Sequence, residues 1–262
     1  MKKMLLFGFI FFASTIAYCQ KAVIEDGVAE YATYTYKIPE ISEVREGKIG
    51  YTVLKKLNTN LLIAIFGEDV FINDAPKPTK MFSAQDLASA YASNIKASVA
   101  QSGMGQGCTN LDYEITHNDN GILSLTFQQQ FMGAYPSGFS NMICLSLLDG
   151  STISENALYN NYTAQAAVHG ILEKIINARA TEKLASIEDI NTEDPFAITL
   201  KKPVNISGNL PFQVSRQGIT YQFLFGFPHV AQSMEPDPNY LLTWDVLSPY
   251  IDKKGLFATF YK

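Results

Sequence analysis

Charged residues, histidine and tryptophan are scarce in this chain of 262 residues. The shortage of charge and the shortage of histidine each argue against a class of protein. Charged residues make up 17% of the sequence and form no long run of either sign. This argues against nucleic-acid binding, which requires a concentrated basic surface. The three histidines, His117, His169 and His229, show no spacing typical of a zinc site, and no G-x-S-x-G motif occurs. We therefore expect no metal, no cofactor and no nucleic-acid partner.

Apolar and aromatic side chains are abundant. At 47% of the sequence, apolar residues are sufficient for a packed core and exclude disorder as the dominant state. The chain has 14 Tyr and 17 Phe but one Trp, and this composition favours β-rich packing. No internal repeat or low-complexity segment marks a linker, so the length allows one large or two small domains.

The N-terminal residues predict export. Lys2 and Lys3 precede an apolar run from Met4 to Ala17, which is shorter than the roughly 20 residues that a membrane-spanning helix requires. With Cys19 before Gln20, the run is typical of a signal peptide over residues 1–19. We expect a periplasmic or secreted bacterial protein with no transmembrane span in the mature chain. The alternative is a lipoprotein acylated on Cys19, although Tyr18 is a poor fit to that motif.

Two cysteines, Cys108 and Cys144, remain after such a cleavage. In an oxidising compartment they could form one disulfide, which would stabilise the fold by roughly 3–4 kcal/mol. The alternative is that Cys144 is a small buried apolar residue in a strand and that Cys108 is a loop thiol. A Cys108 nucleophile paired with His117 is a weaker third hypothesis.

The spacing of apolar residues predicts an α+β fold, with antiparallel sheets and two main helices packed on them. Strands are expected over residues 31–39, 111–115, 123–129, 142–148, 212–215, 219–225 and 240–244, the two main helices over 83–103 and 163–184, and a short helix over 245–250. Residues 48–65 fit a buried strand or a helix. Ser83 and Asp86 stand in the spacing of a capping box, and Asp149-Gly150 predicts a tight turn.

Polar groups that could suggest chemistry have simpler explanations. The run from His117 to Gly121 is typical of a hairpin turn and lacks the remaining calcium ligands of an EF-hand. Glu188, Asp189, Glu193 and Asp194 lie in a polar connection and are expected to be solvated. His169 lies beside the apolar stripe of the second helix, where a histidine that is either satisfied by a partner or exposed is expected rather than a ligand.

Two segments resemble the RsiV-like family. The first has Gly133-Ala134-Tyr135-Pro136 before a strand over 142–147, then the Asp149-Gly150 turn and Leu158-Tyr159. The second has Gly218-Ile219-Thr220-Tyr221-Gln222-Phe223, a Pro228-His229 break, and Leu242-Thr243-Trp244-Asp245-Val246-Leu247 before Tyr250-Ile251. The resemblance covers residues 110–262, and residues 20–109 resemble the smaller α/β segment that often precedes this domain. The family's "IAPYA-G" segment is reduced here to residues 229–233.

The resemblance implies an extracytoplasmic domain. In one branch of the family it is the lysozyme-sensing exterior of an anti-sigma factor, and in another it accompanies a peptidoglycan deacetylase domain, whose Asp/His metal set is not found here. We therefore expect an exported, non-enzymatic module that binds a protein or peptidoglycan ligand in the envelope. Tyr135, Pro136, Phe139, Phe227 and His229 are the candidate binding residues. The alternatives are a cell-wall hydrolase with an unrecognised site and a lipid-anchored structural protein.

Overall fold

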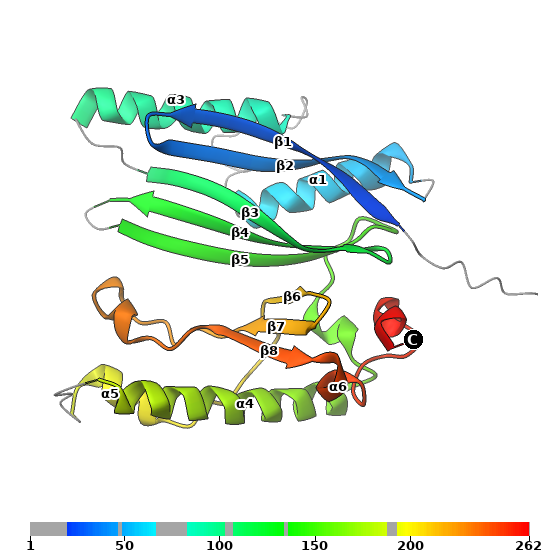
Figure 1. Ribbon diagram of the computed structural model, residues 1–262, viewed down its shortest axis with the longest axis vertical. Helices are drawn as coiled ribbons and strands as arrows, with labels where there is room; N and C mark the ends of the chain where they lie inside the picture. The colour runs from blue at the N-terminus through cyan, green and yellow to red at the C-terminus, as the bar shows by residue number, and fades with distance from the viewer. Residues whose placement is uncertain are drawn as a thin grey trace, which may run out of the picture.

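A computed structural model describes residues 20–46, 49–66, 83–102, 107–133, 136–187 and 193–261. The expected signal peptide lies outside these ranges. The described residues form an α+β fold built on two sheets, with the five-stranded sheet above the three-stranded sheet in Figure 1. In the part of the chain described, no helix combines the length and apolar character needed to cross a membrane.

The larger sheet has its strands in chain order, and one of its pairings is parallel. The strands are β1 (Lys21–Tyr31), β2 (Tyr34–Arg45), β3 (Gly107–Asp119), β4 (Ile122–Met132) and β5 (Pro136–Ser146). β2 and β3 run parallel and pair only through Thr35 with Asn110 and Tyr36 with Leu111. The expectation of purely antiparallel sheets is therefore wrong for this sheet, which is mixed. The domain boundary expected between residues 109 and 110 falls inside β3.

The single strand expected over residues 31–39 is instead parts of two strands. The chain turns at Ala32 and Thr33, where Ala32 has a φ of 54°, and β2 then continues through Pro39 to Arg45. Pro39 pairs with Asp26 of β1 and lies beyond the short seam with β3. Its missing N–H is tolerated because the other edge of β2 has no partner strand there. β5 also contains a proline, Pro136, as its first residue, so this strand starts earlier than expected from Met142.

Helices α1 (Tyr51–Phe66) and α3 (Ala84–Ser102) pack against this sheet. The structure thus resolves residues 48–65 as mainly helical. The capping box that begins α3 is confirmed, since the Asp86 N–H donates to Ser83 Oγ (3.1 Å) and the Ser83 N–H to Asp86 Oδ2 (3.4 Å). α3 approaches β1 so closely that a Cβ on Gly27 would lie 2.1 Å from the carbonyl carbon of Ala84.

The smaller sheet is an antiparallel meander of β6 (Phe212–Val214), β7 (Gly218–Gln222) and β8 (Asn239–Thr243). The long helix α4 (Tyr162–Ala185) packs along it, as expected, and α5 (Pro195–Lys201) packs beside the end of α4 (Figure 1). The short helices are α6 (Trp244–Leu247) and three 3₁₀ turns, η1 (Glu155–Leu158), η2 (His229–Met234) and η3 (Leu256–Tyr261). The sequence did not predict α5, in which the expected solvated Asp194 caps the helix by accepting from the Phe196 N–H (2.8 Å).

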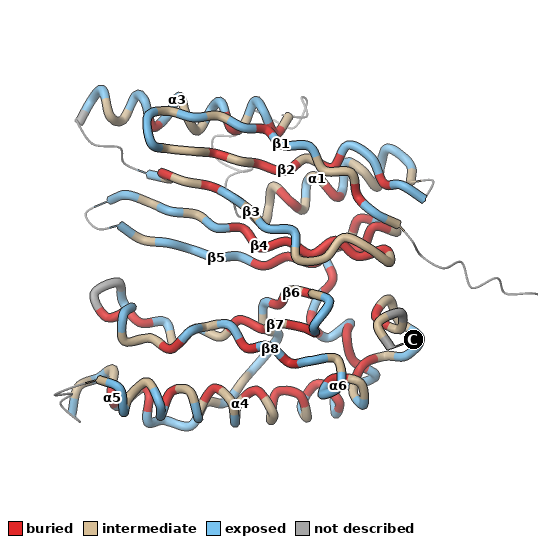
Figure 2. Tube along the Cα trace, in the orientation of Figure 1, coloured by how far each residue is buried: buried red, intermediate tan, exposed pale blue. Residues whose placement is uncertain are grey.

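The two sheets meet at one end of β4 and β5. Residues 122–127 of β4 are buried without interruption, because Leu123, Leu125 and Phe127 face the helices of the larger sheet and Ile122 faces the core around α4. The other halves of β4 and β5 are largely exposed (Figure 2). At the junction, the buried hydroxyl of Ser124 accepts from the Val214 N–H of β6 (3.0 Å) and the Cys144 thiol of β5 (3.3 Å).

The two remaining cysteines do not form the disulfide that the sequence allowed. Cys108 pairs with Phe131 of β4 and Cys144 with Ser124, so the two lie seven residues apart along that strand. At about 3.3 Å per residue this is roughly 23 Å, well beyond the reach of a disulfide. Both thiols are free, and Cys108 lies in a strand rather than the expected loop. Burial raises the pKa of Cys108 to about 11 and that of Cys144 to about 12.

Candidate functional site

A row of polar side chains along α4 defines the most distinctive site of the described chain. Gln165, His169, Glu173 and Asn177 follow one another at intervals of four residues, which places them on one face of the helix. They face the irregular segment 204–210 that leads into β6. Glu173 and Asn177 are half-buried on this face, because the segment covers it.

The row holds the backbone of segment 204–210. The Val204 N–H donates to Asn177 Oδ1 (2.9 Å), and the Ile206 N–H donates to Glu173 Oε1 (2.8 Å). At the other end Gln165 Nε2 donates to Asn209 Oδ1 (3.0 Å). A segment without strand or helix partners must satisfy its N–H groups in another way, and here the helix side chains supply the acceptors.

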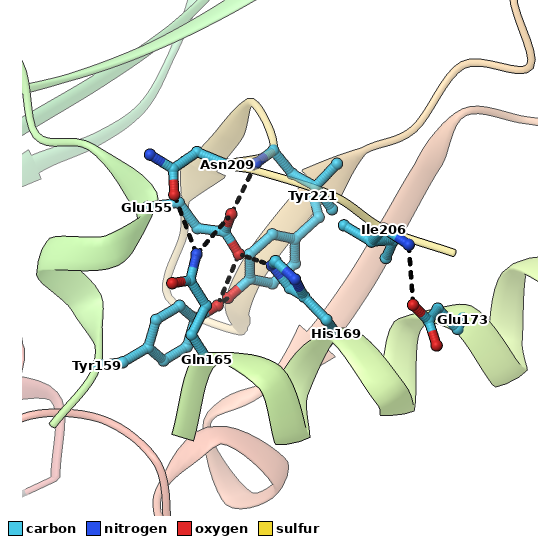
Figure 3. A network of polar contacts seen from close by, with 9 residues as sticks. Glu155, Tyr159, Gln165, His169, Glu173, Ile206, Asn209 and Tyr221 are labelled. Atoms are coloured by element: carbon cyan, nitrogen blue, oxygen red, sulfur yellow. Dashed lines mark hydrogen bonds and ion pairs between the residues drawn. The ribbon is translucent and has the colours of Figure 1, made fainter. Parts of the chain in front are cut away.

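Glu155 completes this arrangement from outside the helix (Figure 3). It lies in η1, its side chain is fully buried, and it accepts the Leu210 N–H (2.6 Å) that ends the segment. His169 Nε2 lies 2.8 Å and the Tyr159 hydroxyl 3.0 Å from Glu155 Oε1, and Gln165 Nε2 lies 3.4 Å from Oε2. A carboxylate has lone pairs enough to contact all four of these groups. His169 therefore has a polar partner, which agrees with the expectation for this histidine.

A pair of tyrosines extends the network into the core below the smaller sheet. Because the proton of Tyr159 is directed at Glu155, the Tyr221 hydroxyl donates to Tyr159 across 2.8 Å. Burial, and then the neighbouring Tyr221 and Glu155, raise the pKa of Tyr159 far above its ordinary value. The phenol therefore stays protonated at physiological pH and can donate to Glu155.

An open cleft of about 850 Å³ lies on the outer side of this network. Its walls are segment 205–209, the polar row of α4 from Gln165 to Glu173, and the chain that enters α4 over residues 156–162. The volume falls within the roughly 300–1,000 Å³ of ordinary ligand sites. The lining is unusually rich in carboxamides, which are contributed by Asn156, Asn160, Asn161, Gln165, Asn205 and Asn209.

The sequence-predicted binding residues whose side chains the structure describes, Pro136, Phe139 and Phe227, do not line this cleft. Pro136 begins β5, and Phe139 further along the strand is 63% exposed, with its ring against Phe131 (5.6 Å between centroids). Phe227 is buried and packs on the rings of Phe196 and Phe225. Tyr135 lies outside the described residues, and His229 begins η2 with its side chain outside them. The start of β5 and η2 lie toward the same end of the molecule in Figure 1.

Sequence reasoning missed Glu155, Gln165 and Glu173. Glu155 gives no motif, because its partners stand 4 to 55 residues away along the chain. The one available signal was the four-residue spacing of polar side chains within a helix that also carries a complete apolar stripe. Among the described residues, no group of three or more His, Cys, Asp or Glu side chains is arranged to hold a metal ion.

These features define an α+β protein with two stacked sheets and a carboxamide-lined cleft beside its long helix. No protein-family model matches the sequence, and no curated protein matches it. Among solved structures, a member of the DUF3298 family from Bacteroides fragilis matches with a TM-score of 0.51 and 12% identity, covering 94% of this chain and 98% of that one. A DUF3298 family protein from Pseudomonas aeruginosa matches with a TM-score of 0.45 and 10% identity, covering 90% and 94%.

The chain therefore shares the fold of the Bacteroides fragilis protein over most of its length. DUF3298 is the RsiV-like domain, so the resemblance drawn from the sequence is confirmed at the level of the fold. The match extends beyond the expected residues 110–262 and includes β1, β2 and the helices between β2 and β3.

Proposed function

We propose that this protein is an exported, non-enzymatic binding module and that the cleft beside α4 is its binding site. One observation carries the proposal: the carboxylate at the centre of the site is used internally, whereas amides and hydroxyls are presented to the cleft. Glu155 is 1% exposed, and its two oxygens contact Tyr159, Gln165, His169 and the Leu210 N–H. The apolar N-terminal run supports export to the periplasm or the medium.

A cell-wall hydrolase is the main alternative, and the geometry favours it less. Glycoside hydrolysis ordinarily uses two carboxyl groups that flank the scissile bond and reach the substrate. Glu173, which lines the cleft, and Glu155, which is buried behind it, each accept a backbone N–H from segment 204–210. A group that holds the wall of a site is poorly placed to transfer protons to a ligand within it.

The test is a calorimetric titration of the chain from Gln20 onward with soluble peptidoglycan fragments and, separately, with a lysozyme-type protein. We expect saturable binding of one of them. Ser207→Trp should abolish that binding, because the indole would fill the cleft that Ser207 lines. Phe139→Ala should leave it unchanged, and this variant also tests the surface expected from the sequence.

Three results would overturn the proposal. One is that neither ligand binds. Another is that binding survives Ser207→Trp but is lost in Phe139→Ala, which would move the site to the β4–β5 hairpin. The third is release of reducing ends from peptidoglycan by the purified chain but not by Glu155→Gln, which would establish a hydrolase.

A further inference from the structure

Several polar groups in the cleft have no partner among the described residues. The side chains of Asn205 and Ser207 make no hydrogen bond there, although both line the cleft. Asn160 uses its Nδ2 on the Tyr250 carbonyl (3.1 Å), and Asn161 uses its Oδ1 to cap α4 (2.9 Å to the Ala164 N–H). Asn160 Oδ1 and Asn161 Nδ2 therefore remain for a ligand. The free groups include both donors and acceptors.

These free donors and acceptors suit the hydroxyl groups of a ligand better than they suit a charged group. A hydroxyl both donates and accepts, and a carboxamide or serine can answer either role. The described residues that line the cleft include Glu173 but no lysine or arginine, so an anionic ligand would meet a carboxylate without a compensating cation from among them. The cleft is suited to a neutral, polyhydroxylated molecule.

An exposed aromatic ring stands at the entrance of the cleft. Tyr162 is the first residue of α4, borders the cleft and is 84% exposed. The ring lies directly after the Asn161 cap, which fixes the backbone that carries it. A pyranose has hydroxyls around its rim and C–H groups on its faces, so one face can pack on an aromatic ring while the rim meets polar groups. Tyrosine suits such a boundary because its body is apolar and its tip is polar.

We propose that the cleft is a carbohydrate site that takes a neutral oligosaccharide, with one sugar ring stacked on Tyr162 and its neighbour hydrogen-bonded to Asn205 and Ser207. This inference rests on the proposed function and adds the class of ligand. Segment 204–210 presents both polar side chains, and Glu155 and Glu173 hold that segment in place before any ligand arrives. Such preorganisation lowers the entropic cost of binding.

The experiment is a titration with the neutral trisaccharide of N-acetylglucosamine, followed by calorimetry and by the amide shifts of residues 160–169 and 204–210. We expect saturable binding, at least about tenfold weaker in Tyr162→Ala and within about threefold of the parent in Tyr162→Phe, which keeps the ring. Asn205→Ala should also weaken binding. Tyr51→Ala is the matched control, since Tyr51 is 68% exposed and is likewise the first residue of a helix, α1.

The proposal is overturned if the trisaccharide does not saturate the protein, or if Tyr162→Ala binds it as well as Tyr51→Ala does. Thermal melting of each variant verifies that the exposed substitution leaves the fold intact. Binding of a charged peptidoglycan fragment or a lysozyme-type protein that Ser207→Trp abolishes, without trisaccharide binding, would overturn the carbohydrate assignment and leave the proposed function standing. The absence of binding to all probes would overturn both.

Discussion

His169 Nε2 lies 2.8 Å from Glu155 Oε1, and this contact joins the middle of α4 to a turn that precedes the helix in the chain. Through the same carboxylate the turn also holds Leu210, at the end of the opposite cleft wall. One buried side chain therefore connects three segments that are separate in sequence. The shape of the cleft depends on that connection, because nothing regular in the backbone fixes segment 204–210.

Removal of the central carboxylate should destabilise the whole fold. Glu155→Ala leaves His169, Tyr159 and the Leu210 N–H without their acceptor in a buried site, and we expect a loss of about 3–5 kcal/mol in the free energy of unfolding. Urea denaturation followed by circular dichroism measures it. Glu182→Ala, on the exposed side of α4, should change stability by no more than about 0.5 kcal/mol. Equal effects of the two substitutions would contradict the role given to Glu155.

Substitution of Glu173 should act locally rather than globally. Glu173→Ala removes the acceptor of the Ile206 N–H, and a hydrogen bond to a charged group contributes about 1.5–3 kcal/mol. We expect amide exchange at Ile206 to accelerate by at least about tenfold, with little change at core strand positions such as Ile219. Hydrogen exchange followed by NMR resolves the two sites, and Lys174→Ala on the exposed neighbouring position is the control. Unchanged exchange at Ile206 would show that the segment is held by other contacts.

Two glycine-to-alanine substitutions should have opposite effects. Gly27→Ala places a methyl group 2.1 Å from the backbone of Ala84 and must push α3 away from β1, with an expected cost of about 1–3 kcal/mol or more. Gly170→Ala meets nothing within 4 Å in the middle of α4 and should stabilise by about 0.5–1 kcal/mol through helix propensity. The two melting temperatures, compared with the parent, test the close approach of α3 directly.

The thiols should be present, slow to react and sensitive to high pH. Since burial raises the pKa of Cys108 to about 11, its thiolate fraction at pH 8 is about a hundredfold below that of a thiol with pKa 9. Reaction with a disulfide reagent should therefore be slow in the native protein, rise about tenfold per pH unit, and become fast for both cysteines in urea. If no thiol reacts with the reagent in urea, the two cysteines instead form a disulfide.

The raised pKa values of the two thiols predict that the folded state loses stability at alkaline pH. A thiol whose folded pKa is raised favours the folded state while it is protonated, so its contribution is complete below pH 9 and is lost as pH rises toward 11 and 12. Unfolding free energies at pH 8 and pH 11 should therefore differ more in the parent than in Cys144→Ala, in which the buried thiol is absent. A larger loss in the variant would contradict this.

Elements with local signals were predictable, and contacts between distant residues were not. Ser83 and Asp86 stand three residues apart and form the expected capping box, and Asp149-Gly150 forms the expected turn, where Gly150 has a φ of 73°. The helix α4 followed from its apolar stripe. The β1–β2 turn was missed because Ala32 and Thr33 carry none of the usual turn residues.

The candidate site was hidden for a related reason. The partners of Glu155 lie on η1, α4 and the segment before β6, and no spacing in the sequence brings them together. Glu173 and Asn177 gave no separate signal in the sequence, because the acceptors that the backbone of 204–210 requires are visible only once that segment is placed. Phe227 was a candidate for a binding surface, yet its side chain is buried by packing on α5.

The parallel seam between β2 and β3 has a consequence for the order of folding. β3, β4 and β5 form a meander of neighbours in the chain, which can assemble through short loops. Tyr36, in contrast, must pair with Leu111 across a long connection that includes α1 and α3. Closing a long loop costs conformational entropy, and the two residue pairs formed at that moment offset little of this cost. The β1–β2 hairpin should therefore join a preformed meander late in folding, and it should be the first part of the larger sheet to detach when the protein is stretched from its N-terminus.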